Sequence, residues 1–250
     1  MPPKHPQHDL TQNILITGLR GVGKTVLLEE LRPLAAQHGW LWTGNDWNEA
    51  AAVSEKYTGI GVDVSLVWLI AAQRLIAERG GQPILTAALA EALPLRTGSV
   101  SAVISLDVIE HVAHPRPFLA EIDRVTSPQG GIALSTPNRY SLAAEPHVFL
   151  WGVGWLPRRW QSAYVEWRRG ERYDFARLLS TWEMAGFLRK HTSFRYTILI
   201  PPIPDCEINV FPPRRAMLAR LYNRLAVSRW LRWAFLVVGP FFRVVGKKPA

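Results

Sequence analysis

The stretch that decides the fold reads SAVISLDVIEHV at residues 101–112, then RPFLAEIDRVT at 116–126 and GGIALSTPN at 130–138. The first and third pieces are short apolar runs, whereas the middle piece repeats its apolar residues at helical spacing. A strand, a helix and a second strand in succession are typical of a parallel sheet, because the helix carries the chain back across the sheet. The first of these strands ends at an acid, Asp107.

The same alternation continues on both sides of this unit. The expected strands are 13–18, 59–65, 191–202 and 241–248, and the expected helices are 24–39, 65–81 and 173–187. We therefore predict an α/β fold. It is a Rossmann-like, mostly parallel sheet flanked by helices, whose first strand and helix come from residues 13–39.

Residues 139–172 interrupt this rhythm and are rich in tryptophan and arginine. In open α/β sheets, ligands bind beyond the carboxyl ends of the strands. An insertion at that edge is expected to form a lid or a substrate wall.

Composition sets the broad class. The chain has 250 residues, of which 48% are apolar, and a net charge of +9, so a folded domain with a real core is expected. A single cysteine, Cys206, fits a reducing cytoplasm. The first residues lack the apolar run of a signal peptide, and no run of about 18 uncharged apolar residues predicts a spanning helix.

The basic charge is concentrated toward the end of the chain. Residues 207–250 carry nine arginines and lysines against Glu207 alone, interleaved with aromatic side chains. Such a segment predicts peripheral contact with an anionic membrane surface, whereas a nucleic-acid partner is not expected. The alternative is a helix whose arginines are solvated and whose aromatic side chains pack on the core.

A complete phosphate-binding loop occupies ILITGLRGVGKT at 14–25. Its candidate phosphate-binding residues are Gly18, Gly21, Gly23, Lys24 and Thr25. Of these, Thr25 would hold the Mg²⁺ of a bound ATP. The segment resembles the P-loop start of AAA-type ATPases over about residues 10–55. A hydrolase of that kind also needs an ordering acid and a charge-stabilising arginine. The alternative is a remnant that folds but turns over no ATP.

From about residue 59 onward the chain resembles class I S-adenosylmethionine-dependent methyltransferases, in particular the ubiquinone-type group. Four motifs in order carry the resemblance: GVDVS at 61–65, AALAEALPL at 87–95, SVSAVISLDVIEHVAHP at 99–115 and DRVTSPQGGIALSTPN at 123–138. The resemblance implies a methyltransferase that acts on a small-molecule or lipid-like substrate with S-adenosylmethionine as cofactor.

The resemblance also implies cofactor-binding residues. Asp63 matches the acid that takes the ribose hydroxyls, with Val64 beside it in the same motif, and Ala90 and Glu91 match the loop that cups the adenine. Asp107 matches the loop along the methionine moiety. A carboxylate at a strand end can accept hydrogen bonds from two hydroxyls, so the residue types suit the positions. Asp63 is alternatively a strand-end cap.

Two histidines are candidate catalytic bases. His111 matches a position that faces the substrate, and His147 lies in AEPHV at 144–148. An oxygen nucleophile benefits from a base near neutral pH, whereas methyl transfer to carbon or nitrogen need not use one. The alternatives are a helix-start pair at Glu110-His111 and a structural or surface role for His147. No metal site is predicted.

The glycine-rich cofactor turn of such enzymes is missing or degenerate. At its expected distance before Asp63 the chain reads WLWTGNDWNEAAAV (40–53), where only Gly44 fits. Either this is a degenerate turn after a P-loop prefix, or an ATPase fragment has replaced the methyltransferase start, which we favour. The predicted domains are then 1–56 and 57–250. The competing functions are an ATP-binding P-loop protein and a non-catalytic fusion remnant.

Overall fold

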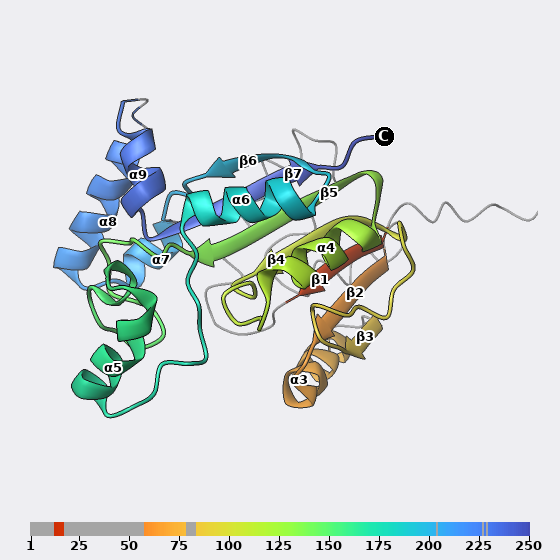
Figure 1. Ribbon diagram of the computed structural model, residues 1–250, viewed down its shortest axis with the longest axis horizontal. Coiled ribbons are helices and arrows are strands. Elements are labelled where there is room, and N and C mark those ends of the chain that lie inside the picture. Colours follow the sequence, from red (N-terminus) through yellow and green to blue (C-terminus); the bar gives the residue numbers. More distant parts are fainter. Residues whose placement is uncertain (1–12, 18–57, 79–83, 204, 227, 229) are drawn as a thin grey trace, which may run out of the picture.

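The computed structural model describes residues 13–17, 58–78, 84–203, 205–226, 228 and 230–250. Its centre is one seven-stranded sheet in the order β3-β2-β1-β4-β5-β7-β6 (Figure 1). All neighbouring strands pair in parallel except at β7, which is antiparallel to β5 and β6. The strands are β1 (Asn13–Thr17), β2 (Thr58–Asp63), β3 (Ile84–Ala87), β4 (Val100–Leu106), β5 (Thr126–Pro137), β6 (Arg195–Leu199) and β7 (Phe241–Lys247).

The register brings the predicted acids to one edge of the sheet. Thr17 of β1 pairs with Val62 on one side and with Ser105 on the other. Because the three strands are parallel, Asp63 and Asp107 both lie at their carboxyl ends. The predicted mostly parallel α/β fold is confirmed. The predicted helix 24–39 and the phosphate loop lie outside the described residues.

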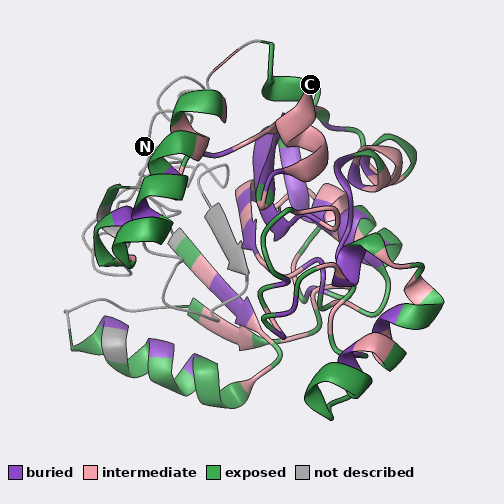
Figure 2. Ribbon diagram, turned by 90° about the vertical axis from the view of Figure 1, so that its left-hand side faces the viewer, coloured by how far each residue is buried: buried purple, intermediate pink, exposed green. Residues whose placement is uncertain are grey.

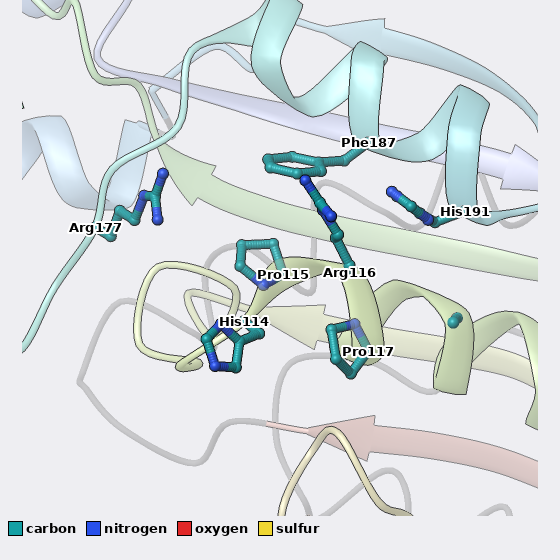
Figure 3. A pocket seen from close by; sticks show the side chains of 8 residues that line it. His114, Pro115, Arg116, Pro117, Arg177, Phe187 and His191 are labelled. Carbon is teal, nitrogen blue, oxygen red and sulfur yellow. The ribbon is translucent and has the colours of Figure 1, made fainter.

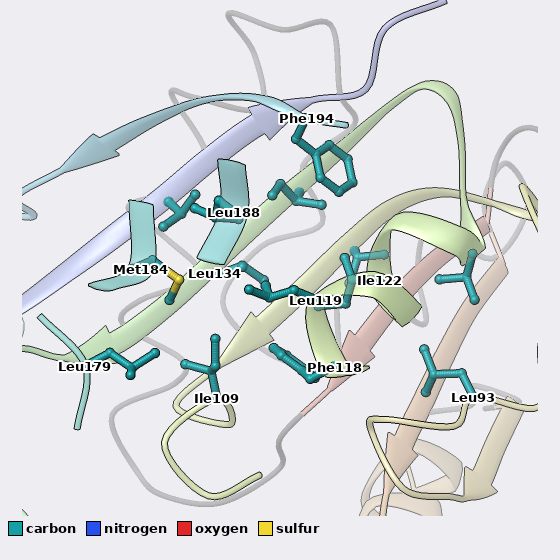
Figure 4. Close-up of a cluster of buried hydrophobic side chains, with 14 of the residues drawn as sticks. Leu93, Ile109, Phe118, Leu119, Ile122, Leu134, Leu179, Met184, Leu188 and Phe194 are labelled. Atoms are coloured by element: carbon teal, nitrogen blue, oxygen red, sulfur yellow. The ribbon is translucent and has the colours of Figure 1, made fainter. Parts of the chain in front are cut away.

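Two helices cover one face of the sheet and enclose most of the core. Helix α4 (Pro115–Val125) and helix α6 (Thr181–His191) pack against each other. Figure 4 shows Phe118, Leu119 and Ile122 of α4 meeting Met184 and Leu188 of α6 above the strands, and all five side chains are buried. Buried residues concentrate along the strands, while the outer sides of the helices are exposed (Figure 2).

Helix α6 begins later than predicted, so the expected helix over 173–187 is wrong in its first half. Ser180 is the N-cap, because its side chain accepts from the Glu183 N–H while Glu183 accepts from the Ser180 N–H. This capping box fixes the helix start at Thr181. Residues 173–180 form an extended segment in which Tyr173 is buried.

The insertion 139–172 folds around a small core of its own. It contains a 3-10 turn, η2 (Val153–Trp155), and helix α5 (Arg158–Arg169). The core consists of Val148, Leu150, Val153, Val165 and Tyr173. In Figure 1 this unit lies beyond the arrowhead of β5, on the side where the parallel strands end.

The other helices in the described part of the chain are α3 (Leu66–Ala77), which follows β2, and α7 (Asp205–Val210), α8 (Pro213–Ala226) and α9 (Arg232–Val238), which precede β7. Helix α8 buries Ala216 and Ala219 and exposes Met217, Leu218 and Leu221. Among the described residues, no helix is long and apolar enough to cross a membrane.

Candidate active site

Three carboxylates line the carboxyl edge of the sheet, as the sequence predicts. Asp63 ends β2, and its Oδ1 accepts the Ser65 N–H at 2.7 Å. Glu91 lies in the loop after β3 and accepts the Ala113 N–H at 3.1 Å, which ties that loop to the loop after β4. Asp107 follows β4 and accepts the Ser135 hydroxyl at 3.1 Å. The hydrogen bonds fix the carboxylates at the end of the sheet where ligands bind in open α/β folds.

Asp107 also has an unusual backbone. Its φ is +52°, in the left-handed region that aspartate adopts more readily than bulkier residues. Its N–H donates to the Ser135 carbonyl at 3.0 Å, so the turn after β4 is tied to β5. This turn directs the following residues, which include Glu110 and His111, along the edge of the sheet.

The other predicted cofactor residues are partly placed. Val64 is exposed next to Asp63, and Ala90 is half-buried in the loop after β3. Gly44 lies outside the described residues. So do the phosphate-loop residues Gly18, Gly21, Gly23, Lys24 and Thr25.

The two candidate histidines, 36 residues apart, are in direct contact. The Nε2 atoms of His111 and His147 are 3.2 Å apart, and the rings meet edge to face. His147 is half-buried and its Nδ1 lies 2.6 Å from Glu145 Oε1, whereas His111 is more exposed. The fold thus builds a chain of three side chains, Glu145–His147–His111, that leads from the protein interior to the surface.

Hydrogen bonding assigns the protons in this chain. The Nδ1 of His111 lies 3.0 Å from the Phe175 carbonyl, which can only accept, so that nitrogen carries a proton. The Nδ1 of His147 likewise donates to the Glu145 carboxylate. A single further proton is then shared between the two Nε2 atoms. When that proton leaves, the Nε2 atoms of the pair can accept a proton from a substrate.

Glu145 is the buried anchor of this chain. Its Oε2 accepts the N–H groups of His147 and Val148, both at 2.8 Å, and its Oε1 accepts the Tyr173 hydroxyl at 3.1 Å in addition to the His147 ring. Burial and the charge of Glu145 raise the pKa of Tyr173, so its hydroxyl stays protonated and donates. Every lone pair of the carboxylate is therefore used.

The pKa of His147 lies above its ordinary value. Burial of the ring lowers this pKa, but the hydrogen bond to Glu145 and the negative charge of that carboxylate more than offset the burial. The negative charge of Asp107 acts in the same direction, as does that of Glu110 once it ionises. His147 therefore stays protonated to a higher pH than an isolated histidine.

Glu110 is a second buried acid beside the pair. Its Oε2 accepts the Thr136 hydroxyl at 3.0 Å, and its Oε1 has no hydrogen-bond partner among the described residues. Burial, reinforced by the charge of Asp107, raises its pKa to about 8. Glu110 is therefore a neutral carboxylic acid at neutral pH.

These side chains also have the composition of a cation site, which the sequence did not predict. Ligand atoms of Glu110, His111 and His147 all lie within 4.8 Å of one another. One carboxylate and two imidazoles are a donor set that suits a divalent cation. The arrangement therefore permits two kinds of chemistry, proton transfer and cation binding.

Comparison with known proteins adds the family context. A methyltransferase domain model matches residues 43–134, a range that includes Gly44 and begins before the predicted boundary at 57. A solved S-adenosylmethionine dependent methyltransferase from Mesorhizobium loti superposes with a TM-score of 0.54 at 14% identity, covering 95% of this chain and 91% of that chain. The fold is that of class I S-adenosylmethionine-dependent methyltransferases.

Other similarities agree with this fold. A phosphoethanolamine N-methyltransferase 2 from Haemonchus contortus, solved in complex with S-adenosyl-L-methionine, gives a TM-score of 0.53 at 13% identity over 96% of this chain and 49% of that chain. A ubiquinone biosynthesis O-methyltransferase from Maricaulis maris is 41% identical over 58 residues, which is 22% of this chain. The match spans 23% of that relative's length. Together these matches show the methyltransferase fold, and a methyltransferase domain match over residues 43–134.

Sequence reasoning missed two members of the candidate site. Glu145 and Tyr173 carry no motif; Glu145 lies inside the Trp-rich insertion 139–172 and Tyr173 follows it directly. The segment Glu145-Pro-His147, an acid two residues before a histidine, was the one available signal.

Proposed function

We propose that this methyltransferase-fold chain transfers the methyl group of S-adenosylmethionine to an oxygen atom of a small-molecule or lipid-like substrate. The observation that carries the proposal is the Glu145–His147–His111 chain at the carboxyl edge of the sheet. Methyl transfer to carbon or nitrogen need not use a base, whereas a hydroxyl nucleophile gains from one that takes its proton. The name of the Maricaulis maris relative, an O-methyltransferase, points the same way.

S-Adenosylmethionine supplies an activated methyl group, so the chain's own residues bind, orient and exclude water. Asp63, held at the end of β2 by the Ser65 N–H, fits the ribose hydroxyls. Val64, Ala90 and Glu91 would line the adenine side, and Asp107 the methionine side. Gly44 lies near the start of the range that the methyltransferase domain model matches. With no side chain, it would let the cofactor approach the protein backbone closely.

His111 would accept the substrate proton on Nε2, because its Nδ1 is committed to the Phe175 carbonyl. His147 would stabilise the resulting charge, and Glu145 would orient His147, since its carboxylate is fully hydrogen-bonded. The pair must first lose its shared proton. Methyl transfer should therefore rise with pH through a pKa above the ordinary 6.5 of histidine.

A turnover experiment tests this proposal. The purified chain is incubated with S-adenosylmethionine and a set of phenols with and without apolar tails, and S-adenosylhomocysteine is measured from pH 6 to 9. His147→Gln should lower the rate by about 10²- to 10⁴-fold and abolish the pH rise. A matched control is Lys190→Gln, an exposed residue of α6 that does not line the site. Activity that is lost on treatment with a chelator and restored by a divalent cation would replace the proton-transfer role with a metal role.

We also propose that the chain meets an anionic lipid surface. In the C-terminal part, Trp230 and Trp233 are exposed, as are Met217, Leu218 and Leu221 of α8. The arginines of the same segment are Arg214, Arg215, Arg220, Arg224 and Arg232. Exposed tryptophan next to arginine suits a membrane interface, where the ring enters the headgroup region and the cation meets anionic lipid. Such a position would bring a lipid-like substrate to the site.

A further inference from the structure

A basic cavity lies beside the candidate active site, and none of the roles above uses it. Its volume is about 540 Å³, and it opens between the start of α4 and the outer part of α6. The lining residues are His114, Pro115, Arg116, Pro117, Ala120, Arg177, Phe187 and His191. A cavity of this size accommodates a small organic molecule.

The charge of the lining is of one sign. Arg116 and Arg177 contribute two guanidinium groups, His114 and His191 add two imidazoles, and no carboxylate lines the cavity among the described residues. Guanidinium groups offer forked N–H donors that match the oxygens of a phosphate or a carboxylate. The polar part of a fitting ligand is therefore an anion.

The remaining lining is apolar. Figure 3 shows Arg116 reaching from α4 toward Phe187, with His191 one turn further along α6 and Arg177 at the opposite end. The rings of Phe187 and His191 lie 6.4 Å apart and share one side of the helix. Phe187, Pro115 and Pro117 provide a surface for an aromatic or aliphatic group attached to the anion.

The cavity is connected to the histidine pair through neighbouring residues of the chain. His114 follows His111 by three residues, and the Arg177 N–H donates to the Glu110 carbonyl at 2.7 Å. The Phe175 carbonyl that orients His111 belongs to the same segment as Arg177. A ligand anchored by Arg177 is thus bound by the same segment that orients His111.

We propose that this cavity binds the anionic group of the methyl-acceptor substrate, a small organic phosphoester or carboxylate. The assignment of the ligand as the acceptor rests on the proposed function; the binding itself does not. Arg116 and Arg177 hold the charged group, and Phe187 contacts the apolar part.

Calorimetry with three probes tests the binding separately from catalysis. Phenyl phosphate, benzoate and phenol share one ring and differ in charge, and each is titrated into the full chain. The proposal expects both anions to bind more tightly than phenol, and the tighter of the two identifies the preferred anionic group. Phenol binding as tightly as the anions would overturn it, because the arginines would then contribute nothing.

Variants locate the site. Arg116→Gln and Arg177→Gln should each lower the affinity for the preferred anion by about tenfold or more, since each removes a charged hydrogen-bond donor. Arg189→Gln, an exposed arginine on the same helix α6, should leave the affinity within about twofold. Lys24→Ala tests the other phosphate-binding candidate. Loss of anion binding in Lys24→Ala, with both cavity variants unaffected, would contradict the proposal and assign the anion to the phosphate loop.

The same titrations distinguish failure here from failure of the proposed function. A chain that binds S-adenosylmethionine but none of the anions retains the proposed function and refutes the cavity proposal. A chain that binds the anions through Arg116 and Arg177 but not S-adenosylmethionine keeps the binding site and refutes its role in methyl transfer.

Discussion

Replacing Glu110 by glutamine should make the protein's stability much less dependent on pH. The side chain is buried and its pKa is raised from 4.5 to about 8, first by burial and then by the charge of Asp107. Below the unfolded-state pKa the acid is protonated in both states. As the pH rises toward 8 the unfolded chain releases this proton and the folded chain does not, so stability falls.

The expected magnitude follows from these two pKa values. Each pH unit between them removes about 1.4 kcal/mol, so the wild type should lose about 4 kcal/mol between pH 5 and pH 9 through this group alone. Glutamine is neutral throughout and can still accept the Thr136 hydroxyl that Glu110 accepts at 3.0 Å. The two proteins should be about equally stable at pH 5, and Glu110→Gln should be more stable at pH 9.

Urea unfolding followed by tryptophan fluorescence at pH 5, 7 and 9 measures this difference. The other titrating groups are common to both proteins, so the difference between variant and wild type isolates Glu110. Glu166→Gln on α5, where the side chain is exposed, serves as the control and should change little with pH. The free energies of unfolding of Glu110→Gln and wild type are compared at each pH. If their difference changes by less than about 1 kcal/mol between pH 5 and pH 9, Glu110 is not a buried neutral acid.

Three further predictions follow from the site and the surface. Asp63→Ala should weaken S-adenosylmethionine by about 10- to 100-fold in calorimetry, because a charged hydrogen bond to the ribose is lost; an unchanged affinity would remove Asp63 from the cofactor site. Lys24→Ala should leave any phosphate release from ATP–Mg²⁺ at the wild-type level, because Asp107, the candidate ordering acid at a strand end, already matches the methyltransferase motif; lysine-dependent turnover would promote the P-loop function to first place. The chain should sediment with anionic liposomes at low salt and be released as the salt concentration rises. Trp230→Ala and Trp233→Ala should each weaken this binding. Absence of binding at low salt would count against contact with a lipid surface.

Much of the fold between residues 59 and 138 was predictable because local pattern and tertiary environment agree there. The apolar runs at 101–106 and 130–137 are too short for helices and became the central strands β4 and β5. Asp63 and Asp107 were found for the same reason, since each ends an apolar run. Strand β3 is four residues long, which gives periodicity little to detect.

The misses have local causes. The start of α6 was misplaced because 173–180 contains apolar residues at helical spacing, but the capping box at Ser180 and Glu183 outweighs that spacing. The contact between His111 and His147 depends on how β5 and the insertion return the chain to the loop after β4. No local pattern encodes that return, so both histidines were named as candidates without any indication that they touch.

The proposed methyltransferase function requires that the chain bind S-adenosylmethionine, and one titration measures this binding. S-Adenosylmethionine is added to the purified full chain in a calorimeter, and ATP–Mg²⁺ is added to a second sample of the same preparation. We expect S-adenosylmethionine to bind saturably at one site per chain and more weakly to Asp63→Ala, with ATP–Mg²⁺ bound weakly at most. Tight, Lys24-dependent binding of ATP–Mg²⁺ together with no binding of S-adenosylmethionine would contradict it.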